Sequence, residues 1–207
     1  MIKVKNLTHY YNNDKALENI NLEINKGEFI CLVGESGSGK STLLSIISTL
    51  LKPTKGELFF ENLNYKNIKD IDDFRKTNIG FIFQFHYLIN YLTVKENIKL
   101  ANEKATENEI HNLLKILRID NLSNKYPNEI SGGQRQRVSI ARALINKPKV
   151  IIADEPTGNL DSKNSLNVFE IFKSLCEKGT TIIVATHDKE LANLTNKIYE
   201  VKDGKIQ

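Results

Sequence analysis

The chain has 207 residues, of which 40% are hydrophobic and 26% charged, and its formal net charge is +4. These values are typical of one globular α/β domain, and they exclude a disordered chain and a second full domain. Lysines and glutamates are spread along the chain, so no nucleic-acid surface is indicated, and no apolar run reaches the ~18 residues that cross a membrane.

Alternating apolar residues predict an antiparallel β layer over residues 1–30. Ile2, Val4 and Leu7 begin the pattern, and a second alternation follows the polar turn at 12–15. Tyr10 and Tyr11 lie between the two predicted strands, where packing within the hairpin is the simplest role for both.

A continuous apolar run over 29–33 predicts a strand buried on both faces, and it contains Cys31, one of two cysteines that form no disulfide framework. The run is followed by Gly34-Glu35-Ser36-Gly37-Ser38-Gly39-Lys40-Ser41, which fits G-x-x-x-x-G-K-[ST] and leads into a helical pattern. Glycines let backbone N–H groups approach a phosphate, Lys40 would reach the β- and γ-phosphates, and Ser41 would bind Mg²⁺. The alternative is a Gly/Ser-rich turn, but the complete motif and the strand–loop–helix context favour a phosphate-binding loop.

The next segment returns to the sheet. A helix stop is predicted at Lys52-Pro53-Thr54-Lys55-Gly56, and a strand is predicted over 57–63. The residues that follow predict a polar helix that includes Ile68, Ile71 and Phe74. A buried strand over 79–83 then ends at Gln84. The carboxyl end of a buried strand is where α/β sheets place their site residues.

Residues 85–131 contain no convincing strand and predict a small helical subdomain inserted into the α/β core. Two helices are predicted over 93–101 and 106–117, the second with a capping box formed by Thr106 and Glu109. At the end of this segment, Ser131-Gly132-Gly133-Gln134 precedes another helix, with Ser131 as its N-cap and two glycines exposing free amides. Taken alone, Ser-Gly-Gly is more often a loop than a site.

Two more buried strands end in polar residues. The strand over 150–153 ends in Asp154 and Glu155, adjacent carboxylates that suit a metal ion and a water molecule, and the strand over 180–185 ends at His187. Between them, a turn containing Asp161 leads into a helix, and a terminal hairpin is predicted after residue 198. When each residue is considered alone, a helix cap is the simplest role for Asp154, and packing in the core is the simplest role for His187.

Together, these motifs resemble the nucleotide-binding domain of ATP-binding cassette (ABC) transporters over essentially the whole chain. The phosphate-binding loop, Gln84, the signature Ser131–Gln134, the strand 150–155, the Asp161 loop and His187 occur in the order typical of the family. The signature is the specific element, because phosphate-binding loops are shared by many NTPases. The resemblance implies a single ABC ATPase domain over 1–207. Its α/β fold would combine a P-loop NTPase (RecA-like) core, 1–84 and 132–207, with an N-terminal antiparallel β layer and the inserted helical subdomain, 85–131.

The same resemblance implies ATP and Mg²⁺ as cofactors and assigns roles to residues. Glu155 would polarise the attacking water and His187 would hold the γ-phosphate, with Gln84 and Lys40 also catalytic. Tyr11, rather than Tyr10, would stack on adenine. The metal residues would be Ser41, Gln84 and Asp154. The nucleotide-binding residues would be Tyr11, Gly34, Glu35, Ser36, Gly37, Ser38, Gly39, Lys40, Ser41, Thr42, Ser131, Gly132, Gly133, Gln134 and Asp161.

The family places the signature away from its own phosphate-binding loop, so the resemblance implies an ATP-dependent head-to-tail homodimer. Residues 153–162 and 85–97 are similar to the MacB/LolD/FtsE group, although Phe85 stands where a polar residue is common. This similarity implies an ATP-hydrolysing subunit at the cytoplasmic face of the plasma membrane. It would energise a separate integral membrane permease (MacB/FtsX-like) that exports a lipoprotein, peptide or antibiotic.

Two other functions stay open at this point. An FtsE-like mechanical ATPase would signal through a membrane partner without transport. A soluble ABC ATPase would act on DNA or ribosomes, but the coiled coils, zinc modules and tandem cassettes usual in such proteins are missing from this sequence, so no nucleic-acid partner is expected.

Overall fold

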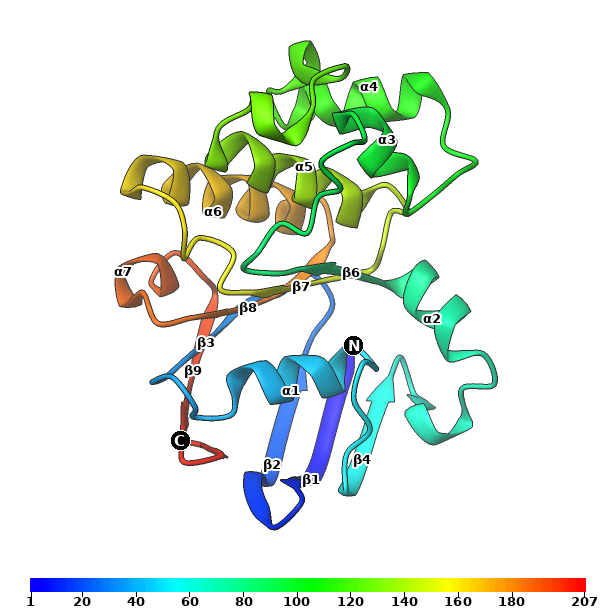
Figure 1. The fold of residues 1–207 in the computed structure, drawn as a ribbon. Coiled ribbons are helices and arrows are strands. Elements are labelled where there is room, and N and C mark those ends of the chain that lie inside the picture. The colour runs from blue at the N-terminus through cyan, green and yellow to red at the C-terminus, as the bar shows by residue number, and fades with distance from the viewer.

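Two β-sheets organise the computed structural model, which describes residues 1–207 (Figure 1). The first sheet is antiparallel, with strand order β2-β1-β4-β5, and contains β1 (Ile2–Tyr11), β2 (Asp14–Ile24), β4 (Lys55–Phe60) and β5 (Leu63–Asn64). The second, with order β10-β9-β3-β8-β7-β6, contains β3 (Phe29–Val33), β6 (Ile79–Ile82), β7 (Val150–Asp154), β8 (Thr181–Thr186), β9 (Lys197–Lys202) and β10 (Lys205–Ile206). All its neighbouring strands are parallel except β9 and β10, which form the predicted terminal hairpin.

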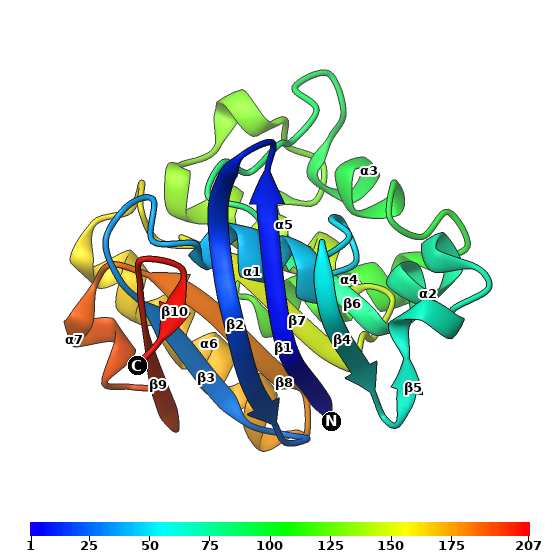
Figure 2. The ribbon, with the colours of Figure 1, turned by 90° about the horizontal axis from the view of Figure 1, so that it is seen from below.

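Helices separate and cover these sheets. The helices are α1 (Lys40–Ile47), α2 (Ile71–Asn78), α3 (Val94–Lys99), α4 (Glu107–Ile116), α5 (Gly132–Leu144), α6 (Ser162–Glu177) and α7 (Lys189–Ala192). Short 3₁₀ turns occur at Tyr65–Asn67, Asp120–Leu122 and Pro127–Glu129. Helix α1 lies between the two sheets, whereas α5 and α6 cover the opposite face of the six-stranded sheet (Figure 1). The view from below shows the antiparallel sheet crossing over α1 (Figure 2).

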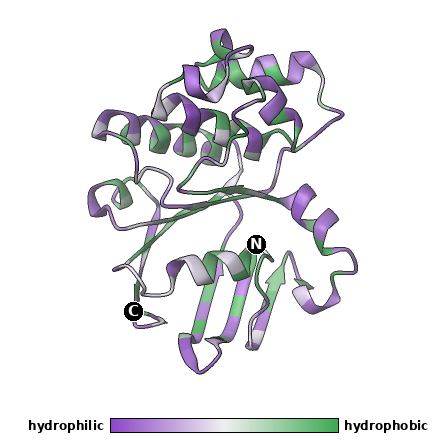
Figure 3. Ribbon diagram, in the orientation of Figure 1, coloured by the Kyte–Doolittle hydropathy of each residue, from purple (hydrophilic) through white to green (hydrophobic).

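The central strands are apolar because both of their faces are buried. Successive side chains along each strand belong to different hydrophobic cores. Phe29, Ile151 and Ile182 belong to the core shared with α5 and α6. Their chain neighbours Ile30, Ile152 and Ile183 belong to the core shared with α1 and the antiparallel sheet. This is the period-two geometry of a strand, and it explains why no polar residue interrupts these runs. Colouring by hydropathy shows the apolar sheet against the polar helix α2 (Figure 3).

The segment between β6 and β7 is helical, as predicted. Helices α3 and α4 each begin with a capping box, formed by Thr93 with Glu96 and by Thr106 with Glu109. Their buried side chains, among them Val94 and Leu114, belong to the same core as α5 and the sheet. The helical segment therefore packs onto the sheet through α5 and does not form a core of its own.

Two local predictions were wrong. The strand predicted over 57–63 is broken into β4 and β5, because Glu61 and Asn62 form a turn with φ of 48° and 71°. Ile68 lies outside α2, which begins at Ile71 because the Asp70 side chain accepts from the backbone N–H groups of residues 72 and 73. No helix in the structure combines the length and the apolar composition that crossing a membrane requires.

Candidate nucleotide-binding site

The phosphate-binding loop joins β3 to α1 and is closely packed against neighbouring backbone. A Cβ atom on Gly34 would lie 2.1 Å from the carbonyl oxygen of Val201, and one on Gly39 would lie 2.8 Å from that of Ala16. Gly39 has φ of 109° and precedes the first residue of α1. Only glycine combines this conformation with this proximity, so the loop exposes bare backbone beside the start of a helix.

Lys40 is held inside this loop. Its Nζ atom donates hydrogen bonds to the carbonyl oxygens of Gly34 at 2.7 Å and Glu35 at 2.9 Å, and the side chain is buried. The loop thereby fixes an ammonium group where backbone N–H groups also gather. Such an arrangement is suited to binding the phosphates of a nucleotide.

A cavity of about 570 Å³ opens at this loop. It is lined by Tyr11, Ala16, Ser36, Gly37, Gly39, Lys40, Ser41, Thr42, Gln84, Glu155 and His187. These residues come from β1, β2, the phosphate-binding loop and the ends of the central strands, so the fold brings most of the predicted site together. Tyr11 lies at its edge, with its hydroxyl 3.5 Å from Thr42 Oγ1, whereas Tyr10 is not among the lining residues.

Asp154, the last residue of β7, has a buried carboxylate atom without a partner. No hydrogen bond reaches its Oδ1 atom. The hydrogen-bonding neighbour of the Asp154 carboxyl group as a whole is the Ser41 hydroxyl. Burial raises the pKa of Asp154, and the nearby charge of Glu155 raises it further. The unpartnered carboxylate oxygen of Asp154 beside the Ser41 hydroxyl is a hard oxygen donor, and Gln84 lines the same cavity as Ser41, so the residues present fit Mg²⁺.

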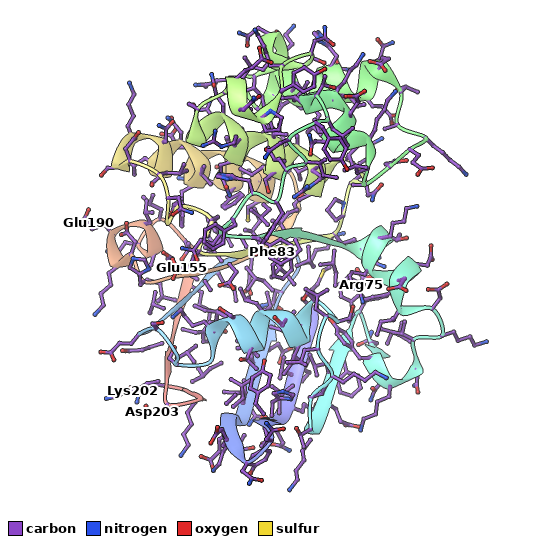
Figure 4. All side chains as sticks on the ribbon, in the orientation of Figure 1. Arg75, Phe83, Glu155, Glu190, Lys202 and Asp203 are labelled. Carbon is purple, nitrogen blue, oxygen red and sulfur yellow. The ribbon has the colours of Figure 1, made fainter.

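Glu155 has a different environment from its neighbour. Its Oε2 atom accepts a hydrogen bond from Thr186 Oγ1 at 3.3 Å and lies 3.0 Å from His187 Nδ1. The Glu155 side chain is 17% exposed and that of His187 is 71% exposed. Glu155 also has φ of 45°, in the left-handed region that is uncommon for glutamate. Figure 4 shows Glu155 between α1 and the helices above the sheet.

The loop that follows β6 carries Gln84 and is held by two other elements. From α5, Arg142 donates to the carbonyl oxygens of His86 and Tyr87, both at 2.7 Å. From α3, the buried Asn97 accepts from the Ile89 N–H at 2.7 Å, and its amide donates to the carbonyls of Ile89, Leu92 and Thr93. Burial lowers the pKa of both Arg142 and His86. Sequence reasoning missed Arg142 and Asn97, although a charged or amide residue within an apolar helical pattern was a usable signal.

Four aromatic side chains are exposed on this same loop, and they are called the aromatic patch here. The patch consists of Phe83, Phe85, Tyr87 and Tyr91. The ring centroids of Phe83 and Tyr87 are 5.3 Å apart, and those of Phe85 and Tyr87 are 6.3 Å apart. Phe85 is 59% exposed and Tyr91 79%. Exposed aromatic clusters of this kind mark contact surfaces.

The signature residues lie at the start of α5, on the other side of the sheet from α1. Ser131 Oγ accepts from the Gln134 N–H at 3.3 Å, and Gln134 Oε1 accepts from the Ser131 N–H at 2.8 Å. Nearby, Asp161 caps α6 by accepting from the N–H and side-chain amide of Asn164. Neither Asp161 nor any signature residue lines the cavity at the phosphate-binding loop. A single copy of the chain therefore presents two separate halves of the predicted site.

Comparisons with known proteins find relatives along the whole chain. The family model described as "ABC transporter" matches residues 17–158, more than half of the chain. The lipoprotein-releasing system ATP-binding protein LolD of Aquifex aeolicus is 45% identical, over 100% of this chain and 96% of that protein. The macrolide export ATP-binding/permease protein MacB of Campylobacter jejuni is 44% identical, again over all of this chain but over only 33% of that protein.

A solved structure extends the similarity to three dimensions. The dimeric cassette MJ0796 of Methanocaldococcus jannaschii has a TM-score of 0.91 and 41% identity, covering 100% of this chain and 97% of that one. The same cassette is also known as a dimer in a post-hydrolysis state bound to ADP and Pi, with a TM-score of 0.90. With its sequence matched along the whole chain and its fold matched by nucleotide-binding cassettes, this chain belongs to the ABC transporter family.

Proposed function

We propose that two copies of this chain close head to tail over two ATP molecules, each copy completing the other's site. The observation that carries this proposal is the separation of the two half-sites. The cavity at Lys40 has no contribution from the signature, although Gly132 and Gly133 place N–H groups without an intrahelical partner at the start of α5. The dimeric form of the similar cassette MJ0796 supports this arrangement.

Within one composite site, each predicted residue receives a role. The loop 34–42 and Lys40 bind the phosphates, and Tyr11 stacks on adenine at the cavity edge. Residues 131–134 of the partner copy approach the γ-phosphate from the opposite side, next to Asp161. Glu155 orients the attacking water, since its carboxylate is anchored by Thr186 and open to the cavity, and His187 contacts the γ-phosphate.

Magnesium would be held by Ser41, Gln84 and Asp154. When bound, Mg²⁺ neutralises charge on the β- and γ-phosphates. The unpartnered oxygen of Asp154 supports its part in this set. Gln84 belongs to the loop that carries the aromatic patch, so it links the nucleotide cavity to an exposed surface.

The aromatic patch is the proposed contact for a membrane permease of the MacB/FtsX-like type. A permease supplies an apolar segment that would cover the exposed rings, and the chain would then work at the cytoplasmic face of the membrane. The similar proteins LolD and MacB are named for lipoprotein release and macrolide export, which supports export of a lipoprotein, peptide or antibiotic. Residues 85–131 would form the subdomain that bears this contact.

The proposal is tested by two substitutions with different outcomes. Lys40→Ala loses ATP binding, because the only ammonium in the phosphate-binding loop is removed. Glu155→Gln keeps ATP binding but loses turnover, because the amide cannot take up a proton from water. Equilibrium binding and phosphate release measure both effects. Retention of full ATP affinity by Lys40→Ala, or of turnover by Glu155→Gln, would contradict the assignment.

A further inference from the structure

The end of β1 places a histidine directly behind Tyr11. Leu7 is buried in the core with α1, and His9, two residues further, is only 6% exposed. Two residues beyond His9, Tyr11 is half exposed at the edge of the nucleotide cavity. His9 is thus the last buried side chain before the strand reaches the site.

The rings of His9 and Tyr11 are in contact. Their centroids are 4.8 Å apart and their planes are inclined by 83°, an edge-to-face geometry that aromatic pairs favour. At its other end, the Tyr11 hydroxyl lies 3.5 Å from Thr42 Oγ1. The tyrosine ring is therefore contacted by a buried ring behind it and by α1 at its tip.

His9 is in turn fixed by Thr54, in the chain that leads into β4. Thr54 Oγ1 lies 3.4 Å from His9 Nδ1 and accepts a hydrogen bond from the Tyr10 N–H at 3.1 Å. The Thr54 N–H donates to the carbonyl oxygen of Thr8 at 3.1 Å. These contacts tie the end of β1 to a second segment on both sides of His9.

The other ring nitrogen of His9 adds nothing to this anchoring. Nε2 is buried and has no hydrogen-bond partner. A buried polar atom without a partner is unfavourable, so an apolar side chain of similar size would fill this position at a lower cost. What His9 contributes is its ring, through the contacts with Tyr11 and Thr54.

We propose that His9 is a positioning residue that holds the Tyr11 ring in the orientation that receives the adenine base. This inference rests on the proposed stacking of Tyr11 on adenine. His9 touches neither the phosphate-binding loop nor Glu155 through any hydrogen bond, so its contribution concerns the base and leaves phosphate binding and hydrolysis to other residues.

The inference is tested by the steady-state kinetics of ATP hydrolysis by His9→Ala. Inorganic triphosphate, a competitive inhibitor that lacks the adenine base, reports on phosphate binding alone. We expect the KM for ATP to rise about three- to ten-fold, the size of a lost aromatic contact, while kcat and the Ki of triphosphate change by less than about two-fold. His9→Phe, which keeps an aromatic ring, restores the KM to within about two-fold of wild type. A parallel rise in KM and Ki, an unchanged KM in His9→Ala, or equal impairment of His9→Phe would overturn the inference.

Two controls separate this inference from the function on which it rests. His111→Ala removes an exposed histidine from α4 and is expected to behave as wild type. Tyr11→Ala tests the stacking itself, and an unchanged KM in that variant contradicts the role of Tyr11. A raised KM in Tyr11→Ala together with a wild-type KM in His9→Ala contradicts only the role of His9.

Discussion

Asp154 and Glu155 are adjacent carboxylates with opposite environments. Glu155 accepts a hydrogen bond from Thr186 and lies against His187, whereas Asp154 has an oxygen atom that is buried without a partner. Two neighbouring acids with different surroundings can perform different tasks, one as the group that orients water and the other as a metal ligand. The strand end therefore carries a cost in stability that a bound cation would offset.

This cost leads to a prediction for Asp154→Asn. Because burial raises the pKa of Asp154, the folded chain binds this proton more tightly than the unfolded chain. The ionised carboxylate thus destabilises the fold at neutral pH, and this penalty disappears as the pH falls through the raised pKa. We expect Asp154→Asn to increase the free energy of unfolding by about 1 kcal/mol at pH 7 without Mg²⁺, while turnover is lost.

Urea unfolding of both proteins at pH 7 and at pH 4 measures the effect. The advantage of the asparagine variant should shrink at the lower pH, because the raised pKa lets more of the wild-type carboxyl bind a proton there. A variant that is less stable than wild type at pH 7, or one that keeps Mg²⁺-dependent turnover, would be inconsistent with this account of Asp154.

At the scale of elements, the loop between β6 and α3 depends on a few long-range contacts. Asn97 makes four hydrogen bonds with this loop and with the start of its own helix, and Arg142 binds two further carbonyls. The loop thereby has a fixed shape although it contains no helix or strand between Phe83 and Leu92. Its shape sets the positions of both Gln84 and the aromatic patch.

We predict that Asn97→Ala lowers the free energy of unfolding by about 2–4 kcal/mol, because it leaves the part-buried Ile89 N–H and three carbonyls without this partner. Asn112→Ala, a change on the surface of α4 where the residue is exposed, serves as the matched control. Denaturant titration gives both values. Equal stability of the two variants would show that the loop does not depend on Asn97.

The sequence predicted the elements more reliably than the contacts between them. The central strands, the phosphate-binding loop and the capped helices are local patterns, and the structure has them where the residues indicated. The turn at Glu61 and Asn62 was missed because it contains no glycine or proline and because glutamate rarely adopts positive φ. The bonds from Arg142 were missed because they join positions 55 and 56 residues apart.

The whole molecule belongs to the ABC transporter family, and such a chain is an ATPase that energises a membrane permease. The six-stranded sheet has a separate core on each face, so one chain can carry the phosphate-binding loop on one face and the signature with the aromatic patch on the other. One face positions α1 and the phosphate-binding loop, and the other positions α5 with the signature and the adjoining aromatic patch. A rigid sheet thus separates the half-sites that the proposed dimer reunites.

The proposed permease contact gives a prediction for the aromatic patch. Phe85→Ser combined with Tyr91→Ser removes two exposed rings without disturbing the core, so the ATPase activity of the isolated chain should stay within about two-fold of wild type. Co-purification with the co-expressed permease should fall at least about ten-fold, as expected when aromatic contacts are lost. Retrieval of the permease at the wild-type level would show that the contact lies elsewhere.

The molecular mass of Glu155→Gln in solution, measured by light scattering with and without ATP, tests the head-to-tail arrangement most directly. We expect a monomer of 23.6 kDa without nucleotide and a species of twice that mass with ATP. Adding Ser131→Arg to this variant should return it to the monomer even with ATP, because the start of α5 can no longer approach the partner's nucleotide. A monomer under all conditions, or an ATP-dependent dimer that persists with Ser131→Arg, would contradict the composite site.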